Sequence, residues 1–146
     1  MILFYGLTGL VVLLDQLTKY FALTRLSENS VPLIPDIFHL TLVRNTGVAF
    51  GFMNEHASLL FAVITVSLVF LFVFANRAHQ ANLPERWALS LIVGGAIGNW
   101  IDRLRFGAVI DFLDFRIWPV FNIADTAITI GVFIYLLSLF RSEKKP

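Results

Sequence analysis

Long runs of apolar residues, each close to the thickness of a lipid bilayer when helical, constrain this chain more than any other feature. Four such runs cover residues 2–23, 57–75, 87–101 and 120–140, and the third is short and rich in glycine. About 20 mostly apolar residues suffice to cross the hydrocarbon core as a helix. A helix satisfies its backbone polar groups internally, as the bilayer requires. The sequence therefore predicts an all-α membrane protein with four transmembrane helices.

The composition agrees with a membrane solvent. Apolar residues make up 58% of the chain and charged residues 14%, against roughly 45–50% and about 25% in an average soluble domain. The net charge of +1 gives no support to a nucleic-acid partner. The first run lacks the charged start and the small-residue cleavage site of a removed signal peptide. We therefore expect residues 1–146 to form a single four-span membrane domain that keeps its first helix.

The segment between the first two runs is too polar to cross a membrane. Pro32 and Pro35 interrupt it, and residues 38–43 have the aromatic and β-branched composition of a strand. Asn45-Thr46-Gly47 is typical of a turn that ends a strand. We predict a small β-sheet at the membrane surface between the first and second helices.

Charged residues inside the apolar runs are candidates for function. A charge at the bilayer centre costs at least ~2.5–3.5 kcal/mol on insertion scales. Asp125 lies near the start of the fourth run, where it is either a site residue or an acid that complements the helix dipole. Asp15 and Lys19 are spaced i, i+4 and can pair on one helix face, as a structural ion pair or as part of a site.

The third run becomes polar on one face where it leaves the membrane. Gly94 and Gly98 form a GxxxG motif, which permits close approach of helices. Asn99, Asp102 and Arg103 follow at i, i+3 and i+4. This pattern fits either an ordinary helix end or one wall of a polar site, and Arg103 either binds a substrate or pairs with Asp102.

Two more acids lie in the apolar stretch before the fourth run. Asp111 and Asp114 precede Trp118-Pro119, which is typical of a membrane interface. They are therefore expected at the same membrane face as Asp125. Two carboxylates close together cannot both ionise, so one can activate water while the other, protonated, polarises a carbonyl group. The residues alone do not decide whether Asp111 or Asp114 is the partner of Asp125.

Other hydrolytic chemistries have no support in the sequence. The chain has no cysteine, no HExxH motif, no G-x-S-x-G motif and no histidines at ligand spacing. Paired aspartates remain, and they imply neither a metal nor a cofactor. Two other classes stay open. A proton-coupled carrier also uses acids within the membrane, although no internal repeat is visible, and a membrane assembly factor can use acids to hold helices together.

Five sequence blocks, in order along nearly the whole chain, resemble the lipoprotein signal peptidase (signal peptidase II) family. They are Asp15-Gln16-Leu17-Thr18-Lys19, Asn45-Thr46-Gly47-Val48-Ala49-Phe50-Gly51, residues 94–103, Val109-Ile110-Asp111-Phe112, and residues 121–127. Each block alone is modest, but together on a four-span chain they are specific. The resemblance implies that Asp111 and Asp125 are the catalytic pair.

The resemblance also implies the remaining features of such an enzyme. Supporting or substrate-binding positions are matched by Asp15, Lys19, Asn45, Asn99, Arg103 and Asn122. The enzyme would lie in the bacterial cytoplasmic (inner) membrane with both termini in the cytoplasm and its site near the outer face. Its substrates would be diacylglyceryl prolipoproteins, cleaved before the lipidated lipobox cysteine among membrane lipids. We expect a monomer without a cofactor.

Overall fold

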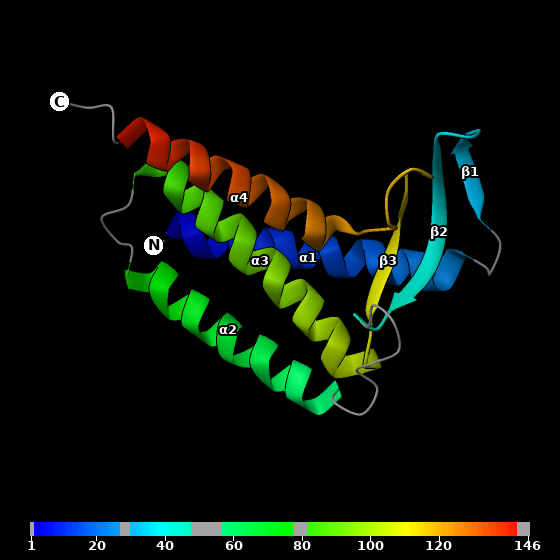
Figure 1. Cartoon of the computed structure of the whole chain (residues 1–146), viewed down its shortest axis with the longest axis horizontal. Coiled ribbons are helices and arrows are strands. Elements are labelled where there is room, and N and C mark those ends of the chain that lie inside the picture. Colours follow the sequence, from blue (N-terminus) through cyan, green and yellow to red (C-terminus); the bar gives the residue numbers. More distant parts are fainter. Residues whose placement is uncertain (1, 27–29, 48–56, 78–81, 143–146) are drawn as a thin grey trace.

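Four helices and a small sheet make up the part of the chain that the structure describes, residues 2–26, 30–47, 57–77 and 82–142 of a computed structural model (Figure 1). In chain order, the elements are α1 (Ile2–Arg25), β1 (Val31–Ile34), β2 (Phe38–Asn45), α2 (Ala57–Arg77), α3 (Leu83–Phe106), β3 (Val109–Asp114) and α4 (Ile123–Ser142). The helices lie at the predicted runs. The third differs most, because it extends beyond residues 87–101 at both ends.

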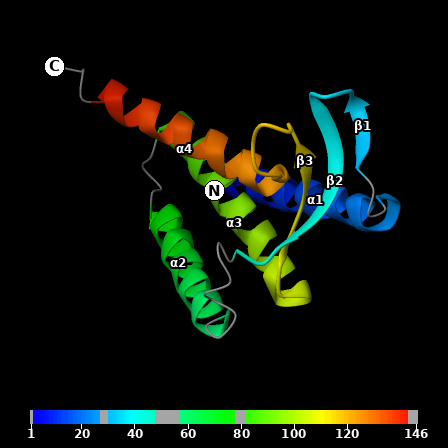
Figure 2. The same cartoon turned by 45° about the vertical axis from the view of Figure 1, so that its right-hand side comes forward.

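Helix α3 is the centre of the helical body. It packs against α1, α4 and α2, and Figure 2 shows α2 beside α3 and apart from α4. Gly94 and Gly98 make the close contact with α1 possible: an added Cβ at Gly94 would lie 2.8 Å from Val11 Cβ, and one at Gly98 would overlap the Asp15 carboxylate. The predicted GxxxG contact is therefore confirmed, and α1 is its partner.

Local signals place both ends of α3. Asn82 accepts a hydrogen bond from the Glu85 backbone N–H at 3.0 Å, so it caps the first turn. Gly107 ends the helix with a φ of 69°, in the left-handed region that favours glycine, and its N–H donates to the Arg103 carbonyl. The chain turns there directly into β3, and Asp111 follows four residues later.

The sheet has the antiparallel order β1-β2-β3. β2 confirms the predicted strand and ends at Asn45, where the expected turn brings Gly47 N–H within 2.9 Å of Asn45 Oδ1. β3, however, comes from between α3 and α4 and pairs with β2, Val43 opposite Asp111. The small sheet predicted between the first two helices is present, and β3 adds a third strand to it that the sequence did not predict. β3 is buried along most of its length, so it lacks the alternation that marks a half-exposed strand.

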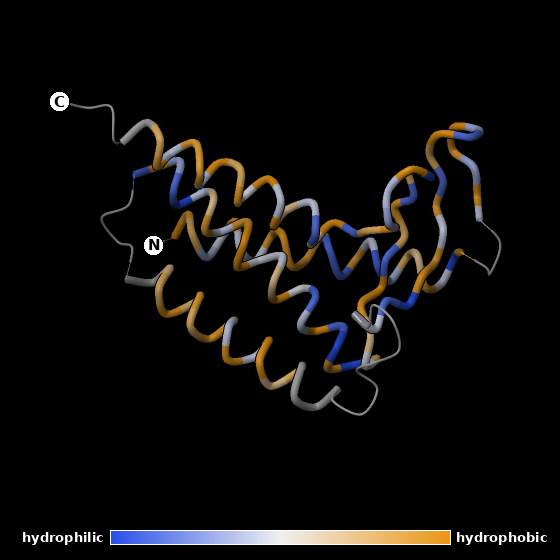
Figure 3. Tube along the Cα trace, in the orientation of Figure 1, coloured by the Kyte–Doolittle hydropathy of each residue, from blue (hydrophilic) through white to orange (hydrophobic). Residues whose placement is uncertain are grey.

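Figure 3 shows apolar residues along the helices. Many of their large side chains are exposed, as expected where lipid is the solvent. Among the described residues, Ile2–Arg25 and Ile123–Phe140 are long and apolar enough to cross a membrane, and Phe61–Ala75 is a shorter apolar helix. Inside the helical body, polar side chains of α1, α3 and α4 are buried together with those of β3. This inverted pattern directs attention to the end of the helices that adjoins the sheet.

Candidate active site

Asp111 and Asp125 approach each other from different elements. Asp111 lies in β3 and is 1% exposed, whereas Asp125 lies half-buried in the first turn of α4. Asn122 Nδ2 donates to Asp111 Oδ1 at 2.6 Å, and Asn45 Nδ2 donates to Asp111 Oδ2 at 2.9 Å. Asn99 Nδ2 donates to Asp125 Oδ1 at 2.8 Å. Asn122 Nδ2 also donates to Asn99 Oδ1 at 3.2 Å. The two carboxylates are therefore joined through the amides of Asn122 and Asn99, while Asn45 of β2 binds Asp111 alone.

Each of these asparagines has its amide orientation fixed by a donor to its carbonyl oxygen. Asn45 Oδ1 accepts from Gly47 N–H, and Asn122 Oδ1 accepts from Asp125 N–H at 2.9 Å, which caps α4. Asn99 Oδ1 accepts from Lys19 Nζ at 2.9 Å. An amide whose oxygen is bound in this way must turn its NH₂ group to the other side. All three NH₂ groups consequently face carboxylates.

The electrostatics suit a pair that shares one proton. Burial raises the pKa of Asp111, the hydrogen bonds from Asn45 and Asn122 lower it, and the neighbouring Asp125 charge raises it further. The net effect is a raised pKa of Asp111, as expected where burial and a neighbouring carboxylate both resist its ionisation. An ionised carboxylate beside a protonated one is the arrangement that activates water and polarises a carbonyl group.

A buried ion cluster holds in place the two elements that carry Asp111 and Asp125. Lys19 Nζ lies 2.9 Å from Asp15 Oδ2 and 2.7 Å from Asp102 Oδ2, and all three side chains are almost fully buried. Asp15 Oδ1 accepts from Ala124 N–H, and Asp102 Oδ2 accepts from Ile110 N–H, both at 3.0 Å. One carboxylate thus holds the start of α4 and the other holds β3. The predicted Asp15–Lys19 pair is confirmed, and it bridges the elements that carry Asp125 and Asp111.

Gln16 and Asp102 also belong to this cluster, although the sequence did not assign them to the site. Gln16 Nε2 donates to Asp102 Oδ1 at 3.0 Å and to Asp15 Oδ2 and the Gly98 carbonyl at 3.2 Å. Asp102 was visible only as part of a polar helix face. Gln16 was not predicted as part of the cluster, because it carries no charge and its position beside Asp15 does not reveal that it contacts another helix.

Arg103 lies at the edge of the site with hydrogen-bonding capacity to spare. Its Nη1 donates to the Asn99 carbonyl at 3.2 Å, and its buried Nε has no hydrogen-bond partner among the described residues. Asp102 pairs with Lys19, and no ion pair joins it to Arg103. Arg103 and Asp102 thus form no direct ion pair, and binding of a substrate by Arg103 stays a prediction.

Asp114 is separate from this network. Its Oδ2 accepts from Thr41 Oγ1 at 2.8 Å, and its Oδ1 accepts from the Arg116 backbone N–H at 2.8 Å. The hydrogen bond from Thr41 is the main reason why the pKa of Asp114 is lowered, and the backbone bond from Arg116 adds to it. Of the two candidate partners of Asp125, Asp111 joins its hydrogen-bond network. Asp114 instead accepts hydrogen bonds from Thr41 of β2 and from Arg116.

Two apolar grooves adjoin the carboxylate network. The α2 groove, about 340 Å³, runs between α2, α3 and α4, and its lining includes Val63, Leu68, Leu71, Ala96, Asn99 and Arg103. The α4 groove, about 470 Å³, runs along α4, and its lining includes Phe115, Trp118, Phe121, Asp125, Thr129 and Ile130. Among the described residues, no group of three or more histidine or acidic side chains is placed to hold a metal ion.

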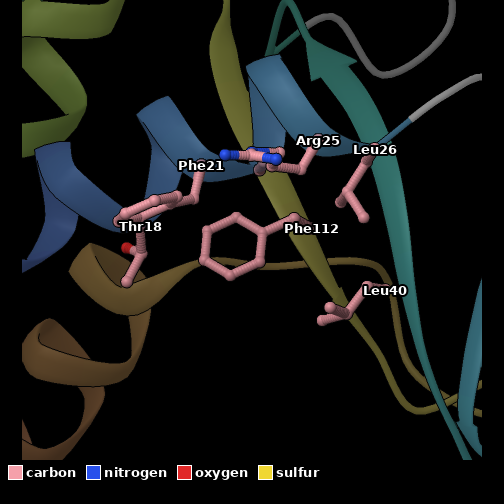
Figure 4. A pocket seen from close by; sticks show the side chains of 7 residues that line it. Thr18, Phe21, Arg25, Leu26, Leu40 and Phe112 are labelled. Carbon is pink, nitrogen blue, oxygen red and sulfur yellow. The ribbon is translucent and has the colours of Figure 1, made fainter.

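A third groove, of about 210 Å³, lies between α1 and the sheet (Figure 4). Phe112 extends into it towards α1, next to Leu40, and Arg25 lies above the ring. Because Phe112 follows Asp111 in β3, its side chain leaves the strand on the face opposite the carboxylate network. This groove therefore belongs to the back of the sheet.

Comparisons with known proteins identify the family of the chain. Residues 7–141 match the family model described as signal peptidase (SPase) II. The chain is 41% identical over 141 residues to a lipoprotein signal peptidase of Halothermothrix orenii, covering 96% of this chain and 97% of that one. It is 48% identical over 133 residues to a lipoprotein signal peptidase of Moorella thermoacetica, covering 90% and 88%. A solved structure described as a bacterial membrane enzyme matches with a TM-score of 0.83 and 36% identity, covering 97% of this chain and 91% of that one. The chain therefore belongs to the signal peptidase II family.

Proposed function

We propose that the protein is an intramembrane aspartyl endopeptidase that removes the signal peptide from diacylglyceryl-modified bacterial prolipoproteins. Cleavage would fall before the lipidated lipobox cysteine. Family membership supports the substrate class. The observation that carries the chemistry is the fixed orientation of the amides of Asn45, Asn99 and Asn122 towards Asp111 and Asp125.

The hydrogen bonds suggest a role for each aspartate. Both oxygens of Asp111 accept amide N–H groups, and these hydrogen bonds offset part of the cost of burying its ionised form. Oδ2 of Asp125 receives no hydrogen bond from the described residues, which leaves it free to carry the proton. Asp111 would therefore take a proton from the attacking water, while Asp125 donates one to the scissile carbonyl oxygen. The tetrahedral intermediate would collapse as the leaving nitrogen is protonated, without a cofactor or metal.

Four membrane-crossing helices would place this chemistry beside lipid. We infer that α1 to α4 all cross the cytoplasmic membrane, with both termini in the cytoplasm and the sheet at the outer face. A lipidated substrate could then move sideways from the bilayer into the grooves beside Asp125. Arg103, with its unpartnered Nε, is suited to bind a backbone carbonyl of the substrate.

Cleavage by purified protein tests the proposal. Wild-type protein in detergent should release the signal peptide from a diacylglyceryl prolipoprotein. Asp111→Asn and Asp125→Asn should each lower the rate by at least about 10²–10⁴-fold, because each removes a proton-transfer group. Both variants should remain folded by their elution and melting behaviour.

Asp114→Asn is the matched control for these variants. Its carboxylate binds Thr41 and Arg116 instead of the amide network, so it should retain most of the activity. An inactive Asp114→Asn together with an active Asp111→Asn would reverse the assignment. A wild-type protein that cleaves no lipidated substrate would favour a carrier or an assembly factor.

A further inference from the structure

The α2 groove and the α4 groove meet at one hydrogen-bonded pair. Asn99 lines the α2 groove, Asp125 lines the α4 groove, and the amide of Asn99 donates to Asp125 at 2.8 Å. The candidate catalytic acid thus lies where two separate apolar surfaces converge. A single signal helix does not by itself account for two such surfaces.

The two grooves differ in what they offer a ligand. The α2 groove offers hydrogen-bond donors to a ligand. Arg103 Nε has no partner among the described residues, while Arg103 Nη1 donates to the Asn99 carbonyl. In the α4 groove, the hydroxyls of Thr126 and Thr129 donate to the carbonyls of Asn122 and Asp125 at 2.9 and 2.8 Å. Beyond Asp125, the α4 groove therefore presents mainly methyl, methylene and aromatic surface. The signal helix ends beside the scissile bond, and its last backbone carbonyls need hydrogen-bond partners in a dry site. An acyl chain needs none.

The chemistry of the substrate divides in the same way. The scissile bond joins the signal peptide, on its amino side, to the lipidated cysteine, on its carboxyl side. The two apolar parts of the substrate therefore leave the reacting carbonyl in different directions. Both belong to the hydrocarbon region, and both must be accommodated near the carboxylate that acts on the bond between them.

We propose that the α4 groove binds the acyl chains of the lipidated cysteine, while the α2 groove binds the signal peptide with Asn99 and Arg103 at its polar end. This assignment rests on the proposed function. The α4 groove is the larger of the two, and Phe115 stacks on Phe121 at its sheet end, with ring centroids 5.9 Å apart. Thr129 and Ile130 extend it from Asp125 along α4 towards the membrane interior.

Two substrates that differ only in acyl length test the assignment. They share one prolipoprotein sequence and carry either two palmitoyl or two butanoyl chains. Ile130→Trp narrows the α4 groove, so KM for the palmitoyl substrate should rise about tenfold, with a much smaller effect on the butanoyl substrate. Leu68→Trp, the matched change in the α2 groove, should raise KM for both substrates alike. Equal effects of Ile130→Trp on both substrates, or a chain-length effect confined to Leu68→Trp, would overturn the assignment.

A binding measurement keeps the test independent of cleavage. Asp111→Asn, with Trp87→Phe and Trp100→Phe, leaves Trp118 as the single tryptophan, and Trp118 lines the α4 groove. A palmitoyl substrate brominated on its acyl chains should quench Trp118 in unbrominated lipid, and unbrominated substrate should reverse the quenching. Absence of reversible quenching would refute the assignment. If wild-type protein cleaves neither substrate, the proposed function fails, while this measurement still decides what the groove binds.

Discussion

Asn45 shows how a single amide can tune the site. It lies at the end of β2, is exposed on one side, and donates to Asp111 through an NH₂ group whose orientation is fixed by Gly47. A hydrogen bond to the ionised form of a carboxyl lowers its pKa. Asn45 therefore helps to keep Asp111 ionised against the opposing effect of burial.

Asn45→Ala should shift the acidic limb of the pH–rate profile to higher pH. Without this donor, the pKa of Asp111 rises further, so its ionised form is lost earlier as the pH falls. The rate at the optimum should fall roughly tenfold, the scale of one hydrogen bond to a charged group. Arg44→Gln at the neighbouring position is the control, because the Arg44 side chain makes no hydrogen bond or ion pair with another described residue. An unchanged acidic limb in Asn45→Ala would argue against Asp111 as the base.

Lys19 is the residue on which the buried ion cluster depends. Lys19→Met leaves Asp15 and Asp102 almost fully buried without their cation, so stability should fall by about 3–5 kcal/mol. The double variant Lys19→Met/Asp15→Asn removes one of the uncompensated charges and should recover part of the loss. Apparent melting temperatures in detergent would measure both effects. Strictly additive losses would show that the charges act independently.

Much at the residue scale was predictable, because a charge in an apolar run is conspicuous. Asp15, Lys19 and Asp125 were found in this way. The residues alone left Asp111 and Asp114 undecided, since both lie in the same apolar stretch and only pairing with β2 separates their contacts. The resemblance favoured Asp111, and the structure supplies a physical reason in the bonds from Asn45 and Asn122.

At the scale of elements, the helices were predictable and the third strand was not. Apolar length and the glycine pattern identified the helical runs. β3 is held by pairing with β2, more than 60 residues earlier in the chain by the spacing of Asn45 and Asp111. Local composition does not record such a distant partner, and burial on both faces removed the alternation that would have marked the strand.

The contact between α1 and α3 gives an element-scale prediction. Gly98→Ala would place a methyl group against the Asp15 carboxylate, which is fully buried and bound to Lys19 and Ala124. Because neither helix can withdraw without loosening the ion cluster, we expect a loss of about 1–3 kcal/mol, as for other overpacked cores. The apparent melting temperature and the cleavage rate should fall together.

Gly9→Ala on α1 is the matched control for Gly98→Ala. An added Cβ at Gly9 meets nothing within 4 Å, so the change should leave stability the same or raise it by up to about 1 kcal/mol through helix propensity. Equal behaviour of the two variants would mean that the close approach at Gly98 does not hold α1 in place.

For the molecule as a whole, the sheet constrains how the chain passes through the membrane. β2 precedes α2, β3 follows α3, and the two strands are paired. The chain must therefore return to the same side after α2 and α3, so either both helices cross or neither does. The start of α1 and the end of α4 lie at the end of the helical body away from the sheet (Figure 1). This arrangement is consistent with four crossings, even though α3 itself is too polar to be recognised by hydropathy.

The polarity of α3 has a structural cause. Its buried positions include Asn99 and Asp102, which face the carboxylate network and the ion cluster instead of lipid. A helix that supplies the inner wall of a polar site loses mean hydropathy without leaving the membrane. Basic residues usually mark the cytoplasmic side of a membrane protein, but Lys19 and Arg103 bind Asn99 beside the carboxylate network, so their positions do not report the orientation.

Accessibility of introduced cysteines can test the proposed topology with little background, because the chain has no cysteine of its own. The predicted topology places Asn54→Cys, before the second span, and Ile117→Cys, before the fourth, on the outer side, and Ile117 is 94% exposed. Both should react with a membrane-impermeant maleimide added to cells whose outer envelope has been made permeable while the cytoplasmic membrane is still intact. Arg77→Cys and Lys145→Cys should react only after the cytoplasmic membrane is permeabilised. Labelling of Arg77→Cys from outside, together with protection of Ile117→Cys, would invert the orientation. Labelling of Asn54→Cys and Ile117→Cys from opposite sides would contradict the shared sheet itself, because β2 and β3 can pair only on one side of the membrane.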